Sequence, residues 1–227
     1  MGKFNKELLV KLLCELLASL FVEFIGCAMP VQAGMHYAFS WGAGVLASTQ
    51  AFRIVSGAHI NPCISIASMI LQNVEILDGF LYILMQLIGS ALGYGVAYGL
   101  YFKKGMSTKF CVTVVRIDPW WKSILLEFYM TGAWVFAMCA SWHTSNEKLL
   151  ESISLRIGLV VVAATLVGTE ATGASMNPFR SLWPAVVAQY WDYIWIYLVI
   201  PPVTAALLGV CWRFLYLQGK DESKAEE

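Results

Sequence analysis

The sequence has little charge for its length. Only 13% of its 227 residues are Asp, Glu, Lys or Arg, about half the share of a typical soluble domain. By contrast, 59% are hydrophobic. Acidic and basic residues balance to a net charge of zero, so nothing indicates a nucleic-acid partner. Because a soluble protein of this size has too little interior to bury so many apolar residues, the composition predicts an integral membrane protein.

The sequence also lacks the residue patterns of enzymes and of cofactor or metal sites. We find no metal-ligand cluster, nucleophile triad or phosphate-binding loop, so we expect no enzymatic activity, no cofactor and no metal. The alternating polar and apolar residues of barrel strands are absent as well, which favours membrane-spanning helices. Cysteines are few, and five of the six fall in predicted helices, where we expect buried thiols. The five are Cys14, Cys27, Cys63, Cys139 and Cys211, and the sixth is Cys111.

What the sequence does contain is long apolar segments. Six are present, most of them long enough to cross a hydrocarbon core of about 30 Å as helices. They cover residues 8–29, 36–52, 80–102, 123–141, 155–169 and 194–217. Two shorter apolar segments, 61–71 and 177–188, each begin with an Asn-Pro pair. Since asparagine is a favoured N-cap and proline suits the first helical turn, these segments predict two half-length helices.

The two Asn-Pro pairs lie in matching frames. Residues 57–63 read GAHINPC and residues 173–179 read GASMNPF. Each frame places an asparagine, Asn61 or Asn177, in an apolar region, where an unpaired polar side chain is costly. Irregular backbone at membrane depth is tolerated only inside protein or along a wet cavity. The matching frames therefore predict a polar site inside the membrane.

The frames belong to a longer internal repeat. Glu15 stands upstream of the first frame, and Glu127 stands at a similar distance upstream of the second. The single domain of 1–227 thus divides into halves of about 1–102 and 121–217, each with three spans and one half-helix. Three spans reverse the direction of entry into the membrane, so the repeat is inverted, and the functional site of such folds lies at the repeat interface. A short charged tail, 218–227, follows.

The pair SGAHINPC and TGASMNPFRS resembles the signature loops of the aquaporin (major intrinsic protein) family, and the resemblance covers nearly the whole chain. It implies a homotetramer in the lipid bilayer, with a pore in each subunit. It further implies passive passage of water and of small uncharged solutes such as glycerol or urea, with exclusion of protons and ions. The central motif residues would be Asn61, Pro62, Cys63, Asn177, Pro178 and Phe179.

The resemblance also implies a selectivity ring of Trp41, Thr165, Ala174 and Arg180. Strict water channels of the family carry histidine where this chain has Thr165. A ring with two small residues opposite an aromatic and an arginine resembles those of members that pass glycerol or urea. Dedicated glycerol facilitators, however, have aspartate where Ser181 stands.

Two motif residues depart from the family pattern, because Cys63 and Phe179 stand where alanine is usual. Cysteine is a small apolar substitute, whereas phenylalanine must find room or push the half-helices apart. This leaves open a water-only or poorly conducting, unorthodox member of intracellular membranes. Inverted repeats also occur in secondary transporters, which are a further alternative. We favour the plasma membrane, and the distribution of lysine and arginine favours cytoplasmic termini.

The family pattern gives further residues their expected roles. Glu15 and Glu127 would accept hydrogen bonds from the backbone of the signature loops. His59 would lie in the cytoplasmic vestibule as a neutral, hydrogen-bonded residue. Glu23 has no counterpart in the pattern, and either pairing with Arg53 or lining the vestibule is open to it.

Overall fold

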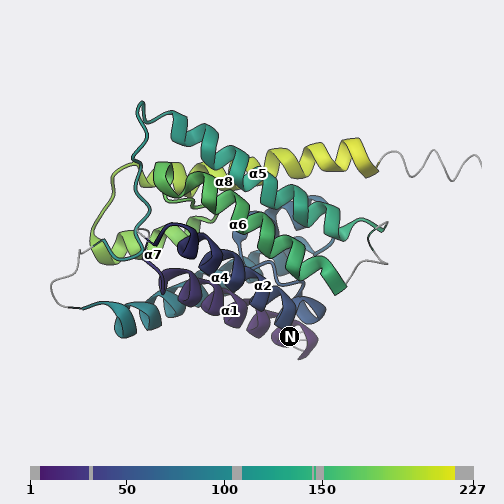
Figure 1. Cartoon of the computed structure of the whole chain (residues 1–227). Helices are drawn as coiled ribbons and strands as arrows, with labels where there is room; N and C mark the ends of the chain where they lie inside the picture. The colour runs from purple at the N-terminus through teal and green to yellow at the C-terminus, as the bar shows by residue number, and fades with distance from the viewer. Residues whose placement is uncertain (1–5, 31–32, 104–108, 145, 147–150, 218–227) are drawn as a thin grey trace, which may run out of the picture.

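A computed structural model describes residues 6–30, 33–103, 109–144, 146 and 151–217. These residues form eight α-helices and one π-helical turn, and no strand is found among them (Figure 1). The helices are α1 (Lys6–Cys27), α2 (Met35–Ser56), α3 (Pro62–Ile70), α4 (Ile76–Tyr101), α5 (Lys122–Trp142), α6 (Ile153–Thr172), α7 (Pro178–Ala188) and α8 (Ile194–Trp212), which continues into η3 (Arg213–Leu217).

Six long helices and two short ones confirm the predicted all-helical class. The predicted ends differ most at α2, which runs on to Ser56, and at α4, which already begins at Ile76. Arg53 and Asp78 interrupt the apolar runs there, but a charged residue near a helix end does not stop the helix. The predicted tail, 218–227, lies outside the described residues.

The outer surface of the helices suits a bilayer. Helices α4, α5, α6 and α8 are long and apolar enough to cross a membrane by composition alone. Helices α1 and α2 have 22 residues each, which at the usual helical rise spans roughly 33 Å, but their composition is less apolar. Large apolar side chains are exposed on the outward faces, and they include Leu84, Leu92, Val96, Val199, Val203 and Leu207. The chain is therefore an integral membrane protein with several spans.

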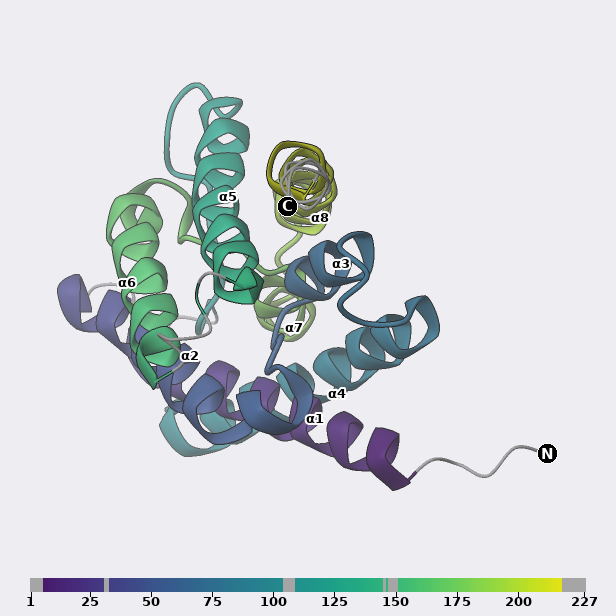
Figure 2. The same cartoon turned by 90° about the vertical axis from the view of Figure 1, so that its right-hand side faces the viewer.

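The long helices surround the two short ones. Helix α1 packs against α2 and α4, and α5 packs in the same way against α6 and α8, while α2 and α6 join the two groups. Figure 2 shows α3 and α7 between α4 and α8, and both short helices contact both long ones. Along the chain, each half has two long helices, then a short one, then a third long helix. Because the short helices lie inside, the loops that lead into them also end in the interior.

Close contact between α1 and α4 depends on glycine. A Cβ atom at Gly89 would meet the carbonyl oxygen of Leu16, and one at Gly93 would meet that of Leu20. Small residues let helix backbones approach each other where no hydrophobic effect drives helix association. Gly95, two residues further along α4, has open space at the same position.

We expect Gly93→Ala to lower the free energy of unfolding by about 1–3 kcal/mol, because the added methyl group forces α1 and α4 apart. Thermal unfolding of the purified protein in detergent measures the effect. Gly95→Ala is the matched control, since it makes the same exchange in the same helix without a clash. Equal melting temperatures for the two variants would contradict the packing argument.

Candidate functional site

The two loops that precede the half-helices have the same backbone conformation. Each begins with a left-handed glycine, Gly57 or Gly173, that ends the preceding helix. Left-handed backbone then recurs at the second and fourth loop positions, which are Ala58 (φ 45°), Ile60 (φ 64°), Ala174 (φ 51°) and Met176 (φ 55°). Such conformations cost about 1–3 kcal/mol for each non-glycine residue, so the surrounding structure has to hold them in place.

In the first loop, the buried carboxylate of Glu15 holds the backbone. Its Oε1 accepts hydrogen bonds from the His59 amide (2.9 Å) and the Ser56 hydroxyl (2.6 Å). Its Oε2 accepts from the Ile60 amide and from Gln86 Nε2, both at 2.9 Å. Four donors thus converge on one side chain of α1.

In the second loop, Glu127 of α5 has the equivalent position. Its Oε1 accepts from the Ser175 amide (3.0 Å) and the Thr172 hydroxyl (2.7 Å), and its Oε2 accepts from the Met176 amide (2.9 Å). The two carboxylates therefore satisfy the same backbone groups in both loops. These groups have few other acceptors, because irregular backbone in the interior lacks the internal pairing of a helix.

Asn61 and Asn177 end the loops and cap the half-helices. Asn61 Oδ1 accepts from the Cys63 amide, and Asn177 Oδ1 accepts from the Phe179 amide, both at 3.0 Å. Asn61 Nδ2 also donates to the Met176 carbonyl at 2.8 Å, which joins the first loop to the second. The positive ends of the α3 and α7 dipoles thus meet at one place.

The remaining residues of the motifs pack around this junction. Pro62 and Pro178 are the first residues of α3 and α7. Cys63 is fully buried in the core, whereas Phe179 is half-buried. His59 is buried, with Nδ1 at 3.1 Å from the Ser65 hydroxyl.

A small cavity lies beside the second loop, and residues from four long helices line it. Trp41, Ala174, Asn177 and Arg180 belong to its wall, together with Val22, Val45, Trp134, Val161, Ser175 and Met176. Its volume of about 10 Å³ is room for about one water molecule. Three of the four expected ring residues thus share one cavity. Thr165 is buried in α6 and is not among the lining residues.

The side chain of Arg180 is almost completely buried, and several contacts hold it in place. Nη1 donates to the Cys111 carbonyl at 3.1 Å, and Nη2 donates to the Gly173 carbonyl at 3.1 Å and to the Tyr37 hydroxyl. The guanidinium carbon lies 4.5 Å from the centre of the Trp41 ring, a distance typical of a cation–π interaction. These contacts hold the charge at the cavity wall.

Unpaired N–H donors are concentrated at the cavity. Within the described part of the chain, the indole nitrogens of Trp41 and Trp134 and Nε of Arg180 have no hydrogen-bond partner. Burying such a donor unpaired is costly, so a passing oxygen atom would be a favourable acceptor. Sequence reasoning missed Trp134. It lies two helical turns after Glu127 and hence on the same face of α5, which is the signal that could have found it.

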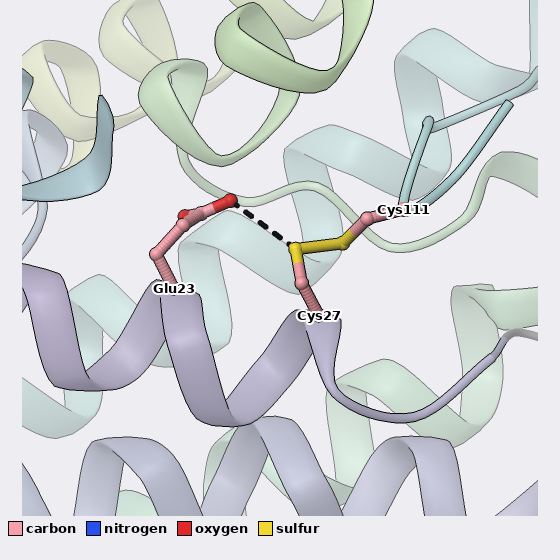
Figure 3. A group of neighbouring side chains, drawn as sticks. All are labelled: Glu23, Cys27 and Cys111. Atoms are coloured by element: carbon pink, nitrogen blue, oxygen red, sulfur yellow. Dashed lines mark hydrogen bonds between the residues drawn. A yellow bond between two sulfur atoms is a disulfide. The ribbon is translucent and has the colours of Figure 1, made fainter. Parts of the chain in front are cut away.

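A disulfide at the end of α1 corrects the expectation for the cysteines. Cys27 is bonded to Cys111, whose Cα lies 5.3 Å away (Figure 3), so Cys27 is not a buried thiol. Cys211 was also predicted wrongly, because its side chain is exposed. Local sequence pattern could not predict this disulfide, because the segment that contains Cys111 contacts α1 only in the tertiary structure.

Glu23 lies beside this disulfide. Its Oε1 is 3.5 Å from Cys27 Sγ (Figure 3). Because bonded sulfur atoms are not thiolates, this group of three residues lacks the ligands of a metal site. The sequence suggested Arg53 as a partner for Glu23. Glu23 lies near the C-terminal end of α1 and Arg53 near the C-terminal end of α2. Because the two helices are antiparallel, these ends lie far apart, and the predicted pairing is wrong.

Comparisons with known proteins agree with this architecture. The chain is 30% identical to aquaporin-4 of Bos taurus over 86% of this chain and 61% of that protein. It is 31% identical to nodulin-26 of Glycine max over 96% of this chain and 81% of that protein. The chain thus spans less than two thirds of the length of bovine aquaporin-4.

The fold has a solved counterpart. The aquaglyceroporin from Plasmodium falciparum matches with a TM-score of 0.77, covering 92% of this chain and 96% of that chain, at 18% identity. Identity this low shows the fold alone. The family model described as major intrinsic protein matches residues 4–212. The chain therefore belongs to the major intrinsic protein, or aquaporin, family.

Proposed function

We propose that this protein is a passive channel for water that also admits small uncharged solutes such as glycerol and urea and excludes protons and ions. The main support is the junction of the two loops. The Asn61–Met176 hydrogen bond joins the N-terminus of α3 to the second loop, and Met176, Asn177 and Arg180 line the cavity beside it.

At the junction, the two asparagines select for uncharged molecules. Each has an amide group with two N–H donors, of which Asn61 uses one for Met176. A water oxygen that accepts from Asn61 and Asn177 together is turned so that its own hydrogens point away from the junction. The two positive dipole ends also disfavour hydronium and other cations there.

At the ring, Trp41, Ala174 and Arg180 set which molecules reach the junction, and Thr165 is the fourth proposed member. Arg180 offers donors to an oxygen atom and repels cations. The Trp41 ring supplies an apolar wall suited to a carbon backbone. His59 is the proposed vestibule residue before the junction, and Glu15 and Glu127 hold the loops that form it.

Size favours water as the main permeant. The cavity holds about one water molecule, so glycerol and urea require its walls to move. Trp134 occupies space there that a smaller residue would leave open. We therefore expect glycerol and urea to pass more slowly than water.

A coupled transporter has less support. Such a protein needs groups near the midplane that bind an ion or exchange a proton. The buried carboxylates of Glu15 and Glu127 are already occupied by loop donors. We propose instead a homotetramer of independent channels in the plasma membrane, with both termini in the cytoplasm.

In proteoliposomes, we expect fast water flux that does not depend on an ion gradient, because a passive channel needs no coupling. Stopped-flow light scattering under an osmotic gradient measures it, and a glycerol gradient gives the glycerol flux of the same vesicles. Flux that requires a sodium or proton gradient would favour the transporter. Well-folded protein without water flux would show that the channel proposal is wrong.

We expect Trp134→Leu to raise glycerol permeability by about tenfold, the order by which the size of an apolar pocket discriminates between molecules. Trp134→Phe keeps most of the bulk but removes the N–H donor, so it separates size from hydrogen bonding. Trp195→Leu is the control, since Trp195 lies on α8 with 43% of its surface exposed. The role of Trp134 is refuted if both Trp134 variants conduct like the control.

A further inference from the structure

The segment between α4 and α5 lies on the second Asn-Pro loop. The amide of Arg116 donates to the Ala171 carbonyl (2.8 Å), and the Thr113 hydroxyl donates to the Ser181 hydroxyl (2.9 Å). Gly173 leaves room for this contact, because a Cβ there would lie 3.2 Å from Thr113 Cα. The segment is therefore fixed between the end of α6 and the start of α7.

Within this segment, Cys111 has two roles in one residue. Its carbonyl oxygen accepts the hydrogen bond from Arg180 Nη1 at 3.1 Å, and its sulfur is bonded to Cys27. Its backbone is left-handed, with φ at 60°, a conformation that a non-glycine residue holds only when its surroundings fix it. The covalent bond and the hydrogen bond are thus separated by a few atoms of a single residue.

The other end of the disulfide lies at the end of α1, next to Trp41 of the cavity wall. A Cβ at Gly26, the neighbour of Cys27, would collide with the Trp41 indole, so the end of α1 lies directly against that ring. Trp41 in turn has Arg180 over its face. The disulfide therefore ties the segment whose carbonyl accepts from Arg180 to the helix that packs against Trp41.

We infer that the Cys27–Cys111 disulfide is a positioning element of the selectivity ring, which holds the Cys111 carbonyl against Arg180 and so sets how strongly the pore prefers water to larger solutes. The effect on permeability rests on the proposed channel function, whereas the effect on Arg180 does not.

Breaking the bond should leave the fold in place. The ring of Phe110 packs against Tyr94, Tyr98 and Phe102 at the end of α4. The hydrogen bonds of Thr113 and Arg116 hold the far side of the segment. Because Cys111 lies between these anchors, we expect loss of the disulfide to shift Cys111 locally.

Reduction by a small dithiol can be written step by step. Cys111 is partly exposed and Cys27 is buried, so a reductant thiolate attacks the Cys111 sulfur and Cys27 leaves as a thiolate, which takes up a proton. The second thiol of the reductant then displaces Cys111, which is protonated in turn. The dithiol loses two hydrogens and becomes a cyclic disulfide, and the protein gains two thiols.

The first test is the ratio of glycerol to water permeability in proteoliposomes. With dithiol, the ratio should rise by about three- to tenfold, the order expected for loss of one ordinary intramolecular hydrogen bond, and reoxidation should restore it. Cys27→Ser and Cys111→Ser should show the higher ratio without dithiol and should not respond to it. Cys139→Ser, which alters a buried free cysteine outside the site, should respond like the unaltered protein.

The second test does not depend on flux. Phenylglyoxal modifies accessible arginines, and mass spectrometry gives the rate at Arg180 relative to the exposed Arg156. Reduction should raise this relative rate several-fold, since Arg180 loses its contact with Cys111. An unchanged rate at Arg180, with both thiols shown to be free by alkylation, would refute the inference even if the protein conducts nothing. Absence of any water flux would count against the channel proposal alone.

Discussion

Two buried carboxylates hold the interior of this protein together. Glu15 and Glu127 each accept hydrogen bonds from consecutive amides of a loop that contains left-handed residues. Without these acceptors the amides would be buried without a hydrogen-bond partner. The free-energy cost of such an unsatisfied donor exceeds the net contribution of a typical hydrogen bond. The caps of Asn61 and Asn177, the meeting of the half-helices and the cavity beside them all depend on this arrangement.

The scaffold is repeated, but the chemistry around it is not. The first loop has His59 and Cys63 near its asparagine, whereas the second has Phe179 and Arg180. The segment 109–117 packs at the second loop, where Thr113 lies against Gly173 and donates to Ser181. One half therefore supplies mainly support at the junction, and the other supplies the fixed positive charge that a selective pore needs.

Local sequence pattern predicted much of the site because the pattern itself is local. An Asn-Pro pair specifies a cap and a first helical turn without help from distant residues. The resemblance to a known family then assigned Trp41, Ala174 and Arg180 to one ring, and these residues do line one cavity. Trp134 was missed, although its spacing of two helical turns from Glu127 places both residues on the same face of α5.

The sequence by itself determined that the chain spans a membrane, that two half-helices begin at Asn61 and Asn177, and that a glutamate precedes each. Apolar length and cap residues act over a few neighbouring positions, so they can be recognised along the chain. Only the tertiary structure decided that Cys27 meets Cys111, at a sequence separation of 84, and that the Cys111 carbonyl holds Arg180. These contacts depend on where a connecting segment comes to lie on helices far from it in sequence, and no local pattern encodes that position.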